Sequence, residues 1–87
     1  MLTDKKGTEA AGEIASWANA VAAQVDKEVT VDVHDDSPDS STYVLRLGKG
    51  ARVLVFRLSY GQVHADGREA ECERTLKRKI KDLQNLI

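Results

Sequence analysis

The order of hydrophobic periodicities along the chain constrains its fold more than any other feature. A helical pattern comes first, three segments of alternating apolar and polar residues follow, and a second helical pattern ends the 87 residues. A chain of this length forms one domain, 1–87, with a single modest core. The order predicts an α+β fold, α-β-β-β-α, in which three strands form an antiparallel meander and both helices pack on one face of the sheet.

The two helices are predicted over residues 8–26 and from residue 66 or 67 to residue 86. Thr8 is the expected N-cap of the first helix, since its hydroxyl can accept a free backbone N–H. We expect residues 1–7 to be disordered. Each helix has one apolar stripe at helical spacing. The stripes consist of Ala10, Ile14, Trp17, Ala18, Val21 and Val25, and of Cys72, Leu76, Ile80, Leu83 and Ile87.

Three strands are predicted over residues 28–34, 42–47 and 51–59, with a tight hairpin at the glycines of residues 48–50. Residues 62–64 are a candidate for a short extra pairing. The third strand is apolar on both sides, so a register slip of one residue would exchange its inward and outward sets. We expect Leu54, Phe56 and Leu58 to face the core, and Val53, Val55 and Arg57 to point away from it.

The order of elements resembles the double-stranded-RNA-binding domain fold and the small HicA-like toxins that share it. The RNA-binding family begins its second helix with a Lys-Lys-x-Ala-Lys-like cluster, whereas residues 67–73 here read Gly-Arg-Glu-Ala-Glu-Cys-Glu. The toxins have a histidine after Gly-Ser or Gly-Thr on a strand, whereas the comparable strand here opens Ser-Thr-Tyr at residues 41–43. The resemblance therefore implies a topology and neither activity.

Composition and charge place the chain among small globular proteins. Hydrophobic residues make up 41% and charged residues 31%. No apolar run approaches the roughly 18 residues of a membrane span, and the first residues do not read as a signal peptide. The single cysteine, Cys72, excludes an internal disulfide. These features favour a cytoplasmic location and no membrane partner.

The charge is divided between the two halves of the chain. Residues 1–40 have 3 basic and 9 acidic side chains, a net charge of −6, and residues 41–87 have 10 basic and 5 acidic ones, a net charge of +5. A chain with this split either neutralises itself across the fold or presents a localised charged face to a partner.

The face of the sheet away from the helices is the first candidate interaction surface, because two helices cover only one face of a three-stranded sheet. Valines with a charged rim on the other face indicate a protein partner or a second copy of the chain. The third strand also offers an edge for strand addition; ordinary surface valines are the alternative reading. The candidate residues are Val44, Arg46, Val53, Val55 and Arg57.

The second helix has a basic face, which is the alternative candidate surface. Four cations within two turns are suited to a phosphate backbone, so nucleic-acid binding is the alternative function. A solvated helix face explains the same pattern. A pI of about 6.1 and the scarcity of aromatic residues count against nucleic acid. The residues are Arg74, Lys77, Arg78 and Lys81.

Catalytic and metal chemistry find little support in the sequence. Cys72 falls on the buried stripe, where a thiol is inert, and no motif joins His34 or His64 to a nucleophile. An acidic cluster follows the first strand, but its order does not fit a calcium loop and a solvated turn explains it. The cluster consists of Asp32, His34, Asp35, Asp36 and Asp39. We therefore expect a non-enzymatic association domain with no cofactor and no metal.

Overall fold

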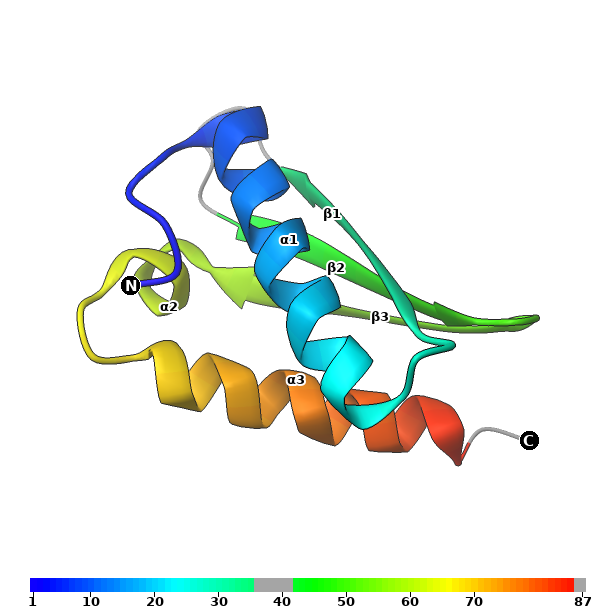
Figure 1. Cartoon of the computed structure of the whole chain (residues 1–87). Helices are drawn as coiled ribbons and strands as arrows, with labels where there is room; N and C mark the ends of the chain where they lie inside the picture. Colours follow the sequence, from blue (N-terminus) through cyan, green and yellow to red (C-terminus); the bar gives the residue numbers. More distant parts are fainter. Residues whose placement is uncertain (36–41, 86–87) are drawn as a thin grey trace.

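The computed structural model describes residues 1–35 and 42–85 and confirms the predicted α+β topology, with one additional short helix (Figure 1). The three strands form one antiparallel sheet in the order β1-β2-β3. The elements are α1 (Gly7–Val25), β1 (Thr30–Asp35), β2 (Thr42–Lys49), β3 (Arg52–Ser59), α2 (Tyr60–His64) and α3 (Glu69–Gln84).

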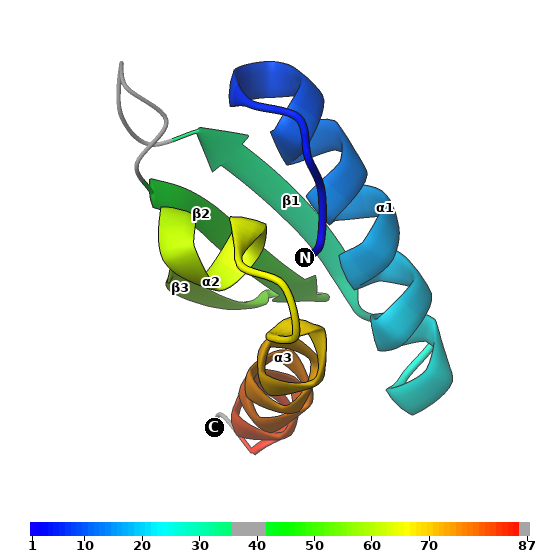
Figure 2. The same ribbon diagram turned by 90° about the vertical axis from the view of Figure 1, so that its left-hand side faces the viewer.

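The core lies between the helices and one face of the sheet. Figures 1 and 2 show α1 along β1 and α3 on the same side of the sheet. The predicted stripes supply this core, although Trp17 and Val25 are only half-buried and Ile87 lies outside the described residues. The inward residues of β3 are the predicted ones, since Phe56 and Leu58 are buried and Leu54 is partly buried against the core. The register predicted for the third strand is thus confirmed.

The backbone of Val31 fixes the direction of hydrogen bonding across the sheet. Its N–H donates to Asn19 Oδ1 at 3.0 Å and its C=O accepts from Asn19 Nδ2 at 2.9 Å, so both groups point away from β2. Alternate residues of an antiparallel strand direct their backbone groups to opposite sides. The groups of Val33 therefore also point to the free edge of β1. The same alternation, traced through the pairing of β1 with β2 and of β2 with β3, shows that the backbone N–H and C=O groups of Val53 and Val55 point to the free edge of β3.

The segment after β3 differs from the sequence prediction, which allowed a short extra pairing at residues 62–64. The chain instead forms the helix α2, because Ser59 and Gln62 make a capping box. Ser59 Oγ accepts from the backbone N–H of Gln62 at 3.2 Å, and Gln62 Oε1 accepts from the N–H of Ser59 at 2.9 Å. Gly67, with φ of 81°, then separates α2 from α3, which begins at Glu69 rather than at residue 66 or 67.

Several other boundaries move by one or two residues; β1, for example, begins at Thr30 rather than at residue 28. Lys6 is the N-cap of α1 and makes no side-chain cap, so the N-cap predicted at Thr8 is wrong and Thr8 lies in the first turn. The hairpin predicted at residues 48–50 is centred on Gly50 and Ala51, and β2 continues through Lys49. Gly50 has φ of 61°, which a primed two-residue turn requires at its first position.

The first residues are packed against α2, although the sequence predicts disorder for residues 1–7. The N–H of Leu2 donates to the carbonyl of Val63 at 2.8 Å, and Thr3 is buried, with its hydroxyl donating to Glu13 Oε1 at 2.7 Å. Polar contacts of this kind leave no periodic signal in a sequence, which is why the pattern of residues 1–7 does not reveal them.

Candidate interaction surfaces

The uncovered face of the sheet presents two exposed valines. Val53 and Val55 of β3 keep 41% and 51% of their surface accessible, whereas Val44 of β2 is half-buried. Arg46 lies opposite Val55 in the register, and Arg57 lies opposite Val44. The structure therefore brings the five predicted residues together on one face. Of the three valines among them, the two on the edge strand β3 are the more exposed.

Charged side chains of both signs lie on the same face. Arg46 Nη1 is 3.7 Å from Asp32 Oδ2, and both side chains are more than half exposed. His34 of β1 is also exposed; it lies opposite Val44 of β2, which in turn lies opposite Arg57 of β3. Exposed pairs of this kind contribute little to stability, so these charges are available to a partner at small cost.

The basic face of α3 is exposed as predicted. Arg74, Arg78 and Lys81 are exposed, and Lys77 is half-buried. Lys77 Nζ lies 3.6 Å from Glu73 Oε2, one helical turn away, so part of its charge is compensated within the helix.

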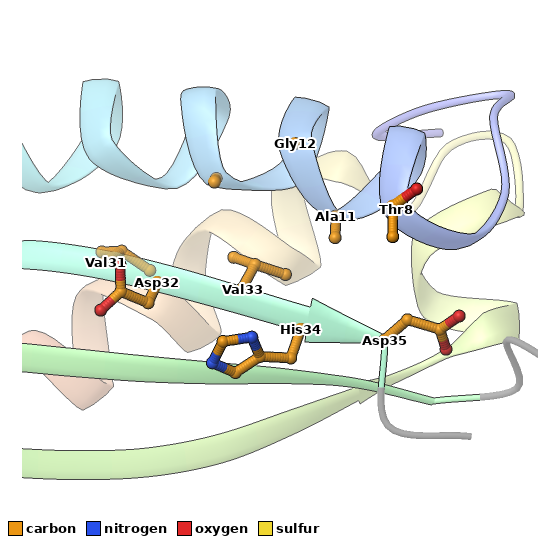
Figure 3. A pocket seen from close by; sticks show the side chains of 9 residues that line it. Thr8, Ala11, Gly12, Val31, Asp32, Val33, His34 and Asp35 are labelled. Atoms are coloured by element: carbon orange, nitrogen blue, oxygen red, sulfur yellow. The ribbon is translucent and has the colours of Figure 1, made fainter. Parts of the chain in front are cut away.

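A groove lies between α1 and β1 (Figure 3), a feature that no periodic sequence pattern predicts. Its volume is about 500 Å³. Thr8, Ala11, Gly12 and Ala15 line it from α1, and residues 31–35 line it from β1. The helix contributes only small side chains, which leaves room beside the strand.

Asn19 lies one turn beyond Ala15 on the same helix face and closes the edge of β1 at Val31. Its side-chain amide supplies one donor and one acceptor to Val31, as the peptide group of a neighbouring strand would. The sequence does carry a signal for this site. Glycine and asparagine are poor residues for a helix interior, and Gly12 and Asn19 are seven residues apart, on one face of α1.

A polar cluster around Tyr43 connects β2, α2 and the first residues. Tyr43 is fully buried and its hydroxyl oxygen is 3.2 Å from His64 Nε2. His64 Nδ1 is 3.0 Å from the carbonyl oxygen of Thr3. Because a carbonyl only accepts, Nδ1 donates to the carbonyl of Thr3, and Nε2 is left to pair with the hydroxyl of Tyr43. Burial raises the pKa of Tyr43 above its ordinary value, and the charge of Asp35 adds to the effect.

The remaining candidates have structural roles in the described residues. Cys72 is buried, burial raises the pKa of its thiol, and its Sγ donates to the carbonyl of Gln62 at 3.2 Å. In the acidic cluster, Asp36 and Asp39 lie outside the described residues. Elsewhere in residues 1–35 and 42–85, no three His, Cys, Asp or Glu side chains gather in a geometry suited to a metal ion. Over the same residues, no helix has the length and apolar character needed to cross a membrane.

Comparisons with protein-family models, with curated proteins and with solved structures each gave no match to this chain.

Proposed function

We propose that this chain is a non-enzymatic association domain that forms a homodimer through the open face of its sheet. The exposure of Val53 and Val55 on an uncovered sheet face is the observation that carries the proposal. Apolar side chains that stay half exposed on one strand lose that contact with water when a second sheet covers them. Two sheets that stack in this way lie about 10 Å apart with their side chains interleaved.

The charges on this face favour a second copy as the partner. A two-fold axis brings the same patch against itself. Asp32 lies on the edge strand β1, whereas Arg46 and Arg57 lie on β2 and β3, so a rotated copy can place the carboxylate of one chain near the guanidinium groups of the other. The same face therefore supplies both partners of an ion pair, which is what a self-complementary interface requires.

The expected dimer is weak. Complete burial of a valine side chain contributes roughly 1.5–3 kcal/mol, and these valines are already about half-buried. Two valines from each copy therefore contribute about 4 kcal/mol. Association costs about 4 kcal/mol at the least in lost translation and rotation. These two terms nearly cancel, so the rest of the face, including the half-buried Val44, must supply the net affinity. We expect a weak dimer that forms only at high protein concentration and that tolerates salt.

The solution mass by light scattering after size exclusion, at low and high salt and over a range of protein concentrations, tests this proposal. A dimer that survives high salt, and that Val53→Asp or Val55→Asp converts to a monomer, supports it. Ala20→Asp, at an exposed position of α1, is the matched control and should leave the mass unchanged. A wild-type chain that stays monomeric at all concentrations and at both salts contradicts it.

Binding of nucleic acid through α3 is the second candidate, and the exposure of Arg74, Arg78 and Lys81 favours it. Fluorescence anisotropy with a labelled random-sequence duplex and a labelled single strand measures it directly. This mode predicts binding that weakens steeply with salt, that Arg78→Glu with Lys81→Glu removes, and that Val55→Asp leaves unchanged. Binding that survives the two charge reversals excludes this face.

A further inference from the structure

We propose that the groove between α1 and β1 binds an extended peptide segment of a partner protein by adding a strand to β1 at Val33. This site is separate from the open sheet face, and it involves the strand at the other edge of the sheet. The ligand class is an extended main chain.

The backbone of β1 shows what the edge can bind. At Val31, the N–H and C=O that point to the free edge are both engaged by the amide of Asn19. At Val33, two residues further along and about 7 Å away, the same pair of groups points to the same side. Among the hydrogen bonds of residues 1–35 and 42–85, no side chain engages them. Asn19 thus takes the place of one peptide unit of a neighbouring strand at Val31, and the groove extends from there along β1 to Asp35.

The side chains of α1 leave the space that a strand would need. Opposite Val33 the helix presents Ala11, Gly12 and Ala15, and Figure 3 shows the side chains of Ala11 and Val33 between helix and strand. A Cβ added at Gly12 would meet no atom within 4 Å. Glycine in a helix interior is less stable than alanine, so the chain keeps an unfavourable residue where packing does not require it. Gly12 thus leaves open space beside β1, which a larger side chain at this position would occupy.

No lysine or arginine lines the groove. The carboxylate of Asp32 lies on the open face of the sheet, 3.7 Å from Arg46 Nη1, so its charge is partly compensated there. Recognition through main-chain groups gives affinity to any extended segment, so the backbone of the ligand rather than its charge decides binding.

Three pentapeptides test the proposal in a titration followed by amide chemical shifts of the full chain. The first reads Lys-Val-Thr-Val-Lys, the second replaces both lysines by glutamate, and the third replaces the central threonine by proline, which removes its N–H donor. The lysine peptide should give saturable shifts at Val33, Gly12 and Ala15. Binding of the proline peptide should be about tenfold weaker, the loss expected for one hydrogen bond. Binding of the glutamate peptide should be similar to that of the lysine peptide, because the main chain decides recognition.

Variants of Gly12 provide the decisive control, because the position has room for a side chain. Gly12→Leu should fill the groove and abolish the shifts at Val33, while the far-ultraviolet circular dichroism stays that of the wild type. Gly12→Ala should keep most of the binding. The absence of saturable shifts at Val33 with all three peptides overturns the proposal, as does binding that Gly12→Leu leaves intact. Shifts confined to Val53 and Val55 would assign peptide binding to the open face, without bearing on the dimer test.

Discussion

The two edge strands of the sheet, β1 and β3, have different surroundings. The β1 edge lies beside α1, whose Asn19 engages the backbone of Val31 and whose small residues leave a groove beyond it. The β3 edge carries Val53 and Val55, which are the exposed large apolar residues of the sheet. An open edge is a template for another strand. The side chain of Asn19 thus covers part of the β1 edge, whereas the β3 edge keeps two exposed valines.

This contrast separates two kinds of interaction on one small domain. At β1 the groups at the free edge are the backbone donor and acceptor of Val33 beside the groove, which favours an extended main chain. At β3 the exposed groups are side chains on an open face, which favours a broad apolar surface such as a second sheet. Variants that alter one edge should therefore leave the other unchanged, and four predictions examine this separation.

Removal of the Asn19 amide should have the largest effect. Asn19→Leu keeps the approximate size of the side chain but removes both hydrogen bonds to the N–H and C=O of the buried Val31. We expect the free energy of unfolding, measured with urea, to fall by about 1–2 kcal/mol. Amide exchange at Val31 should accelerate while exchange at Leu45, in the central strand, changes only as global stability does. Ser16→Ala, at an exposed position of the same helix, is the control. An unchanged stability would show that Asn19 does not close the edge.

The second effect concerns Asp26, which fixes the end of α1 that leads into β1. Its carboxylate accepts from Lys49 Nζ at 2.6 Å and from Gln84 Nε2 at 2.9 Å. The hydrogen bond from Lys49, then those from Gln84 and from the N–H of Glu28, hold the pKa of Asp26 well below its ordinary value of 3.8. The stabilisation is therefore complete above that value and is lost as the pH falls below it.

Asp26→Asn should accordingly be less stable than the wild type at pH 7, and the difference should shrink in acid. Thermal unfolding between pH 7 and pH 2 measures both curves. Other carboxylates also titrate in this range; the pKa of Glu71, for example, is lowered by its hydrogen bond from Arg68. Their contributions to stability are the same in both proteins and cancel in the comparison. A difference in stability that stays constant over this range would show that the charge of Asp26 has no role.

Much of this architecture can be predicted from the sequence, because it follows from burial. The alternation in β3 places Phe56 and Leu58 in the core and Val53 and Val55 outside it, since side chains on successive residues face opposite sides. The helix α2 was missed although its signal, serine and glutamine at positions 59 and 62, can be read in the sequence. A capping box acts over four residues, whereas hydrophobic periodicity becomes visible only over several helical turns, and α2 has only five residues.

The groove could not be predicted in the same way. It depends on the bond between Asn19 and Val31, which are 12 residues apart, and a polar contact between two elements has no periodicity. Gly12 is a visible anomaly within a helical pattern, but its meaning depends on how α1 lies against β1. Sequence patterns therefore predict which face a side chain occupies, and tertiary packing decides which backbone groups remain open.

The third effect is a gain in stability at the β1 edge. Gly12→Ala should raise the free energy of unfolding by about 0.5–1 kcal/mol, because alanine is favoured over glycine in a helix and the added Cβ has no neighbour within 4 Å. Urea unfolding measures the gain, and Ala20→Gly, at an exposed position in the same helix, should show a loss of the same size. If Gly12→Ala is destabilising instead, the space beside Gly12 is occupied in the folded chain, and no groove is open there for a peptide.

The smallest effect is expected at the β3 edge, where the same reasoning predicts a separation of stability from association. Val55→Thr preserves the shape and the strand propensity of the side chain and changes only a half-exposed methyl group. In dilute solution, where the chain is monomeric, the free energy of unfolding should stay within about 0.5 kcal/mol of the wild type. At high concentration the dimer should weaken, because a hydroxyl then has to be desolvated against the second sheet. A dimer of unchanged strength, measured by light scattering, would place the interface away from Val55 while leaving the β1 edge and its groove as they are.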